Sequence, residues 1–185
     1  MIKRLSLISL LLTFFLSAYS QSIVEEAPQS THHKSLNLEI LGAHFGTGVN
    51  FDMRLQKGRI DGLGYRVGIG GFSSASSFTL ASVRSFSILT LPLEINYVVG
   101  KKRHGFIAGV GFIPGIVSIT GDRPRIGDTE IEKKGFSLIG THALVGYRLS
   151  PLNTGLHIQL HYNPMFTSEL GRVEYLGLQI GMGFK

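Results

Sequence analysis

The chain contains no cysteine and no tryptophan, and only 16% of its 185 residues are charged. The absence of cysteine excludes disulfide bonds as a source of stability. Beyond the N-terminal leader, no stretch approaches the ~20 uninterrupted apolar residues of a transmembrane helix, which excludes a helical membrane protein. A protein without disulfide bonds must find its stability elsewhere, and a closed β-barrel does so through its complete ring of inter-strand hydrogen bonds.

The leader itself has the pattern of a cleaved export signal. Lys3 and Arg4 form a positive region, an apolar core follows over 5–16, and small residues precede the expected cleavage after Ser20. The apolar core is too short to span a membrane comfortably, so a transmembrane anchor is disfavoured. Residues 1–20 are therefore predicted to be a signal peptide.

The remaining chain is long enough for one domain, predicted over residues 35–185. Residues 21–34 show no hydrophobic period and are interpreted as a periplasmic lead-in. They include His32 and His33, but adjacent residues of an extended chain point in opposite directions and no third ligand lies nearby. A metal site is not predicted, because zinc needs three or four converging ligands.

The formal net charge is +6, of which Lys3 and Arg4 contribute two charges that are lost with the leader. A basic balance suits nucleic acid, but an exported chain rarely meets any. The expected partners are therefore outer-membrane lipid and the phosphates of lipopolysaccharide.

From residue 35 onward, apolar residues alternate with glycine or polar residues with a period of two, which predicts β-strands. Glycine is abundant, at 24 residues, as tightly curved strands require. Residues 105–119 are apolar on both faces, so their orientation is open. The segments expected to form strands are 36–40, 49–55, 63–70, 89–99, 105–119, 139–148, 156–162 and 176–184.

The connections between these segments alternate in length. Short links are expected at 57–61, 100–104 and 150–154, and longer ones at 73–85, 120–134 and 167–174. Outer-membrane barrels place short turns in the periplasm and long loops outside, which puts the C-terminus in the periplasm and the tight turn near Gly46 outside. If residues 36–55 formed one strand, the barrel would have seven strands, and single-chain bacterial barrels avoid an odd number of strands.

The face opposite the apolar one holds many glycines and few charges, as a cramped lumen needs and a solvated exterior does not. This favours an all-β, eight-stranded, antiparallel up-and-down transmembrane β-barrel over a soluble lipocalin-like binder.

Aromatic girdles form near strand ends, and the residues expected there are Tyr65, Tyr97, Tyr147, Tyr162 and Tyr175. The side chains predicted to face lipid include Leu91, Leu93, Ile95, Ile158, Leu160, Leu178 and Ile180.

The few charges on the glycine-rich face are expected to pair with one another, because an unpaired charge inside a barrel is costly. This predicts a structural network in the lumen. Its members are Asp52, Arg54, Arg66, Glu94 and Arg148.

The export signal, the Gly-rich amphipathic strands and the closing GLQIGMGFK segment resemble the small outer-membrane β-barrel proteins of Gram-negative bacteria. The resemblance is to the porin-family barrels of the OmpA, OmpX and OmpW kind and covers residues 35–185. It implies a monomer in the outer membrane, inserted by the barrel-assembly machinery. That machinery recognises a C-terminal aromatic residue in such families, whereas here Phe184 is penultimate and Lys185 is last.

The default function is a structural or surface-interaction role, without a catalytic residue, cofactor or metal. The first alternative is a narrow OmpW-like channel for small molecules. A less favoured alternative is a lipid A-modifying enzyme, which needs a paired histidine and serine. The candidate bases and nucleophiles are His142, His157, His161, Ser118 and Ser137. The charged loop 120–134 is expected to meet lipopolysaccharide or a surface partner.

Overall fold

The computed structural model describes residues 33–75, 83–121, 131–167 and 171–185. The predicted signal peptide, the lead-in up to His32 and residues 122–130 of the charged loop lie outside the described residues.

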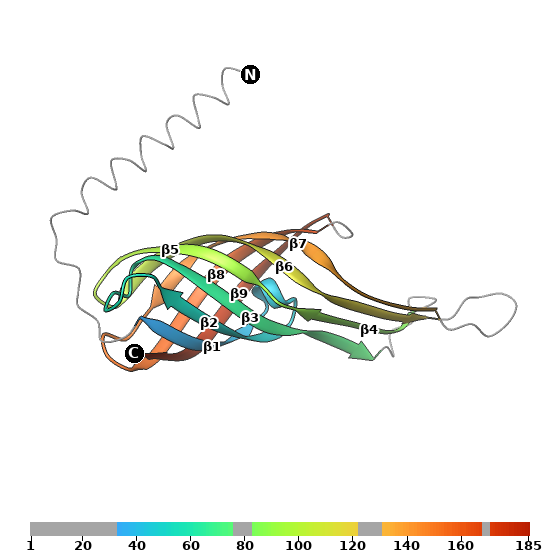
Figure 1. The fold of residues 1–185 in the computed structure, drawn as a ribbon, viewed down its shortest axis with the longest axis horizontal. Coiled ribbons are helices and arrows are strands. Elements are labelled where there is room, and N and C mark those ends of the chain that lie inside the picture. The colour runs from blue at the N-terminus through green and yellow to red at the C-terminus, as the bar shows by residue number, and fades with distance from the viewer. Residues whose placement is uncertain (1–32, 76–82, 122–130, 168–170) are drawn as a thin grey trace, which may run out of the picture.

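The described chain forms one antiparallel sheet that closes on itself (Figure 1). β1 pairs with β9 from Lys34↔Phe184 to Ile40↔Leu178, which joins the two ends of the sheet. No helix in the described segments is long and apolar enough to cross a membrane. The elements are β1 Lys34–Ile40, η1 Gly42–His44, β2 Thr47–Arg54, β3 Gly62–Ala75, β4 Val83–Thr90, β5 Leu93–Lys101, β6 His104–Gly121, β7 Ile131–Leu149, β8 Gly155–Thr167 and β9 Gly171–Phe184.

β4 and β5 are two halves of one barrel strand, because both pair with β3 and with β6. The strand is interrupted at Leu91 and Pro92, since proline has no N–H to donate to the ladder. Single hydrogen bonds bridge the break: the Gly68 N–H donates to the Pro92 carbonyl at 2.9 Å. The protein is thus a closed eight-stranded barrel, which confirms the predicted fold class, and residues 36–55 form two strands.

The apolar faces of the strands point outward. Leu93 is 42% exposed, Ile95 62%, Leu160 56% and Ile180 44%, whereas the polar residues between them along each strand are buried. This is the reverse of a soluble barrel, whose apolar face lines the interior. On β6, whose orientation the sequence left open, Phe106 points outward and Ile107 inward.

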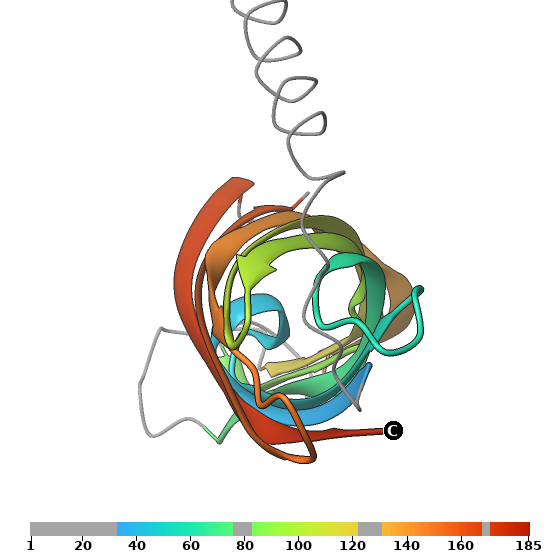
Figure 2. The same cartoon turned by 90° about the vertical axis from the view of Figure 1, so that its left-hand side faces the viewer.

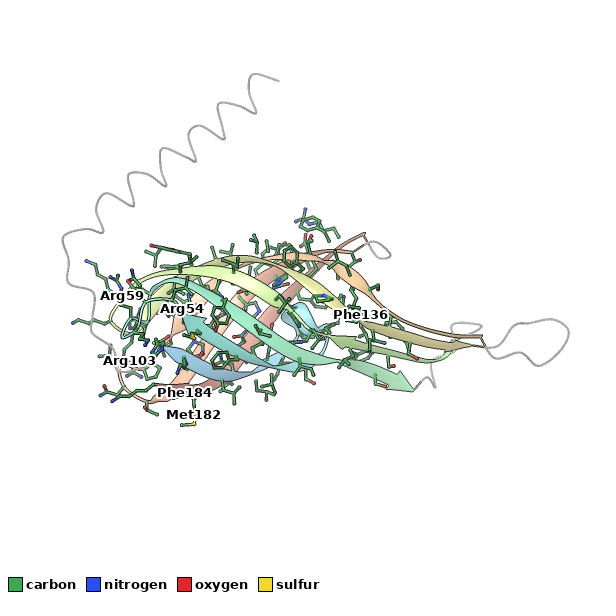
Figure 3. The ribbon with its side chains drawn as sticks, viewed as in Figure 1. Arg54, Arg59, Arg103, Phe136, Met182 and Phe184 are labelled. Atoms are coloured by element: carbon green, nitrogen blue, oxygen red, sulfur yellow. The ribbon has the colours of Figure 1, made fainter. Side chains whose placement is uncertain are left out.

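The outward apolar residues form a continuous belt. On β6 the belt runs from Phe106 to Ile116. This length matches the ~9–11 residues that a tilted strand needs to cross the hydrocarbon core of a bilayer. The belt ends where Ser73, Ser87 and Ser118 pair directly across β3, β4 and β6. Figure 3 shows Phe136 toward the long-loop end of the barrel and Met182 and Phe184 toward the end that carries the short turns.

Two outward placements expected from the sequence are wrong: Ile139, from the alternation, and Tyr175, from its place near a strand end. A β-bulge between Ile113 and Pro114 leaves Ile139 without a partner on β6, and its side chain packs inside the barrel. Tyr175 also points inward and meets Phe45 edge to face, with ring centroids 6.0 Å apart, so it cannot belong to an aromatic girdle. The bulge shifts the alternation at Ile139 by one residue, which a period of two cannot anticipate. Tyr175 instead follows the regular alternation, because its neighbour Leu176 points outward.

The connection between β1 and β2 was expected as a tight turn near Gly46 at the end of the barrel that carries the long loops, and it lies at that end. It folds back into the barrel as the short turn η1, visible within the ring of strands in Figure 2. His44 is completely buried, and η1 contacts β3, β4, β8 and β9. The backbone takes positive φ at Leu41 (64°), Gly42 (68°) and Phe45 (62°), so the inward fold carries local strain.

Replacing Gly42 by alanine should destabilise the barrel by about 2–5 kcal/mol. The positive φ alone costs an alanine about 1–2 kcal/mol, and a Cβ would lie against the Glu39 carboxylate and 2.9 Å from His161 Nε2, which adds an overpacking cost of about 1–3 kcal/mol. Gly171 is the matched control, because its φ is 66° but no atom lies within 4 Å of the added Cβ. Equal losses in equilibrium unfolding of the two variants would show that the space around η1 is not tight.

Candidate functional site: the polar lumen

Strand register brings charged residues from separate strands into one layer of the lumen. Asp52 on β2 pairs directly with Arg66 on β3, and Arg66 pairs directly with Glu94 on β5. Because directly paired residues project from the same face of a sheet, the three side chains meet inside the barrel. Their exposed fractions are 2–4%.

The five residues predicted for the lumen network lie together in one ion-pair cluster. Asp52 is its centre: its Oδ1 lies 2.8 Å from an Arg54 guanidinium nitrogen and 2.9 Å from one of Arg148, and its Oδ2 lies 3.6 Å from Arg66 Nε. Glu94 Oε2 lies 3.3 Å from Arg66 Nη1. All five side chains are buried, and their two carboxylates pair with three guanidinium groups inside the barrel.

Neutral amides complete this cluster. Asn96 donates to Asp52 at 3.2 Å and to Glu94 at 2.8 Å, and it accepts a hydrogen bond from Arg54. Gln159 accepts from Arg66 at 3.1 Å across the lumen. An amide both donates and accepts, so it can bridge a carboxylate and a guanidinium without adding charge.

A second buried cluster surrounds Glu39, which the sequence analysis did not select. Gln179 donates to its carboxylate at 3.0 Å, His161 lies 3.2 Å away, and Asn50 also donates to it. His44 of η1 lies 3.0 Å from both Asn50 and Thr90. Glu39 alternates with outward apolar residues, and this alternation could have identified it as a lumen residue. His44 lies in a turn, where no alternation indicates its position.

The histidines considered as catalytic bases are bonded to lumen amides and acids. His157 lies 2.6 Å from Asn37, and His142 lies 3.1 Å from Asn163. Among the residues that the structure describes, no three histidine, aspartate or glutamate side chains converge as a metal site requires. Ser118 and Ser137 lie on β6 and β7 toward the long-loop end.

Glycines make room for these large polar groups. A Cβ at Gly109 would lie 2.9 Å from Asn96 and 3.0 Å from Glu94, and one at Gly64 would overlap the Arg54 guanidinium. The lumen glycines therefore face long side chains from neighbouring strands. They do not line open space.

The short-turn end of the barrel carries further charge. Arg54, Arg59 and Arg103 lie there in Figure 3. Arg59 donates two hydrogen bonds to Asp61, at 2.9 and 2.8 Å, and these bonds raise the pKa of Arg59. This pair lies in the β2–β3 turn, outside the lumen network.

Comparison with known proteins identifies the architecture. No protein-family model matches the sequence, and no curated protein matches it. The structure is similar to the crystal structure of the N-terminal β-barrel domain of Pseudomonas aeruginosa OprF, with a TM-score of 0.50 and 12% identity over 86% of this chain and 100% of that chain. It also matches the crystal structure of Neisserial surface protein A, with a TM-score of 0.43 and 11% identity over 86% of this chain and 97% of that one. The resemblance to small eight-stranded barrels is thereby confirmed for the fold.

Removing Glu94 alone should destabilise the barrel more than removing Glu94 and Arg66 together. Breaking one side of a buried pair leaves an uncompensated charge and costs about 3–5 kcal/mol, whereas the double variant removes both charges. The measurement is a double-mutant cycle of Glu94→Gln and Arg66→Met by equilibrium unfolding. The same cycle on Arg172 and Glu174, a pair whose side chains are 60% and 48% exposed, should show no measurable coupling. If the Glu94–Arg66 cycle gives no coupling energy, the two charges are not partners.

Proposed function

We propose that the protein is an integral outer-membrane β-barrel with a closed lumen and a structural or surface-interaction role. The observation that carries this proposal is the inverted distribution of polarity: large apolar side chains cover the outside while ion pairs fill the inside. Burying charge while exposing Leu, Ile and Phe is favourable only where the barrel's surroundings are themselves apolar.

The outer membrane is the proposed location for two further reasons. The predicted export leader directs the chain out of the cytoplasm. In addition, a closed barrel leaves no unpaired strand edge in its membrane-crossing part, which makes it one of the two architectures that can span a bilayer. The fold similarity to the OprF barrel domain supports the same assignment.

A closed lumen is proposed in preference to a channel. Eight strands enclose an interior that side chains can just fill, and here Asp52, Arg66, Glu94 and Gln159 cross-link across it. Beyond this layer η1 occupies the lumen. A role at the surface then rests with the loops, which a rigid scaffold presents outside the membrane.

Arginine in the middle of the belt should oppose insertion into lipid. Leu93→Arg and Leu178→Arg are each expected to cost about 2–4 kcal/mol of folding free energy in phospholipid vesicles, because a charge near the midplane must be desolvated. Ser73→Arg is the matched control at the belt's edge and should cost about 0–1 kcal/mol. Denaturant titration followed by the heat-modifiable gel shift provides the measurement. Insertion of the Leu93 and Leu178 variants with wild-type stability would refute the membrane placement.

Refolded wild-type protein should give no steady single-channel current in planar bilayers, because the ion-pair layer and η1 obstruct the lumen. The gel shift on the same sample confirms that the barrel is inserted and folded. Reproducible current steps from folded protein would instead support the narrow channel and exclude the closed barrel.

A further inference from the structure

A small cavity opens at the short-turn end of the lumen, below the Asp52 cluster. It is narrow, with room for about one water-sized particle. The cavity is lined by His33, Lys34, Ser35, Asp52, Arg54, Ile60, Arg148, Ser150 and His157.

The charge of this lining is positive. Arg54 and Arg148 line the cavity with Asp52 as the single carboxylate; Lys34 also lines it, while its Nζ donates to the Lys185 main-chain oxygen at 3.4 Å. Asp52 is also shared with Arg66, so its one negative charge is divided among three guanidinium groups.

The lumen as a whole does not supply the missing negative charge at this end. Its buried acids and arginines are equal in number: Glu39, Asp52 and Glu94 against Arg54, Arg66 and Arg148. Glu39, however, is bound by Asn50, Gln179 and His161, and none of the three arginines forms an ion pair with it. One arginine charge at the short-turn end is therefore left without a carboxylate of its own.

Buried N–H groups at the cavity also lack an acceptor. Within the described chain, Arg54 Nε and Arg148 Nε are buried and make no hydrogen bond, whereas Arg148 Nη2 lies 2.9 Å from Asp52 Oδ1. Such orphaned donors on charged groups are costly and rare in folded proteins. The hydroxyls of Ser35 and Ser150 line the same space and can each donate one further hydrogen bond.

We propose that this cavity binds one small monovalent anion of the halide class, held between Arg54 and Arg148. The anion compensates the surplus arginine charge and accepts hydrogen bonds from the buried N–H groups. A neutral water could accept those hydrogen bonds but could not compensate the charge. Binding stabilises the barrel at the end where its short turns meet. The proposal does not depend on the membrane in which the barrel resides.

Two measurements on refolded wild-type protein in zwitterionic detergent test the site. The ³⁵Cl NMR line of chloride should broaden in the presence of the barrel, and bromide should reverse the broadening by competition. At constant ionic strength, the unfolding temperature should rise with the logarithm of the chloride concentration when chloride replaces gluconate, which is too large for the cavity. Equal unfolding temperatures in chloride and gluconate, with no broadening, would overturn the proposal and leave a water in the cavity.

A pair of variants assigns the effect to the cavity. Arg148→Met removes one side of the site and should abolish both the broadening and the chloride dependence. Arg59→Met removes an arginine at the same end of the barrel that is paired with Asp61 outside the lumen, so both effects should persist. Chloride effects that survive in Arg148→Met, or vanish in Arg59→Met, would place the anion elsewhere and refute this site. If Arg148→Met does not fold, the wild-type measurements alone decide whether an anion binds, and Arg54→Lys tests its location by a weakened response.

Discussion

The carboxylate of Asp52 is the contact on which the interior of this barrel depends. Three guanidinium groups converge on it, from β2, β3 and β7, and all of these side chains are buried. Each of those arginines would carry a large desolvation penalty without a partner. The carboxylate therefore ties together strands that are far apart in the sequence, and it does so only in one register, because a slip by one residue would turn every inward charge outward.

The same constraint explains the composition of the inner face. Long polar side chains fill a narrow cylinder only if their neighbours are very small, and glycine provides that space beside Arg54, Glu94 and His161. Amides such as Asn96 and Gln159 connect the charges without adding to them. The lumen is thus a hydrogen-bonded polar core, and the apolar clusters within it, such as Val98, Ile107 and Leu144, are small.

The two ends of the barrel differ in chemistry, and the difference bears on function. At the long-loop end the lumen contains the strained turn η1 and a small apolar cluster of Ala43, Ile113 and Met165. At the short-turn end it is rich in arginine and opens to a narrow cavity. The proposed scaffold role and the proposed anion site thus rest on different ends of the lumen, and an anion at the arginine-rich end would complete the charge balance of the interior.

Much of this architecture could be predicted from the sequence. Strict alternation of apolar and small or polar residues determines which side chains of β3, β5 and β9 face outward, because successive side chains of a strand point to opposite faces. Inward placement of Asp52, Arg66 and Glu94 follows from the same period. Tertiary structure alone decided which charges meet, since partners such as Arg66 and Gln159 are 93 residues apart in the sequence. It also decided the inward fold of Gly42–His44 and the bulge at Ile139, because both arise where the backbone departs from a regular strand and the space inside the closed barrel determines where the chain can go.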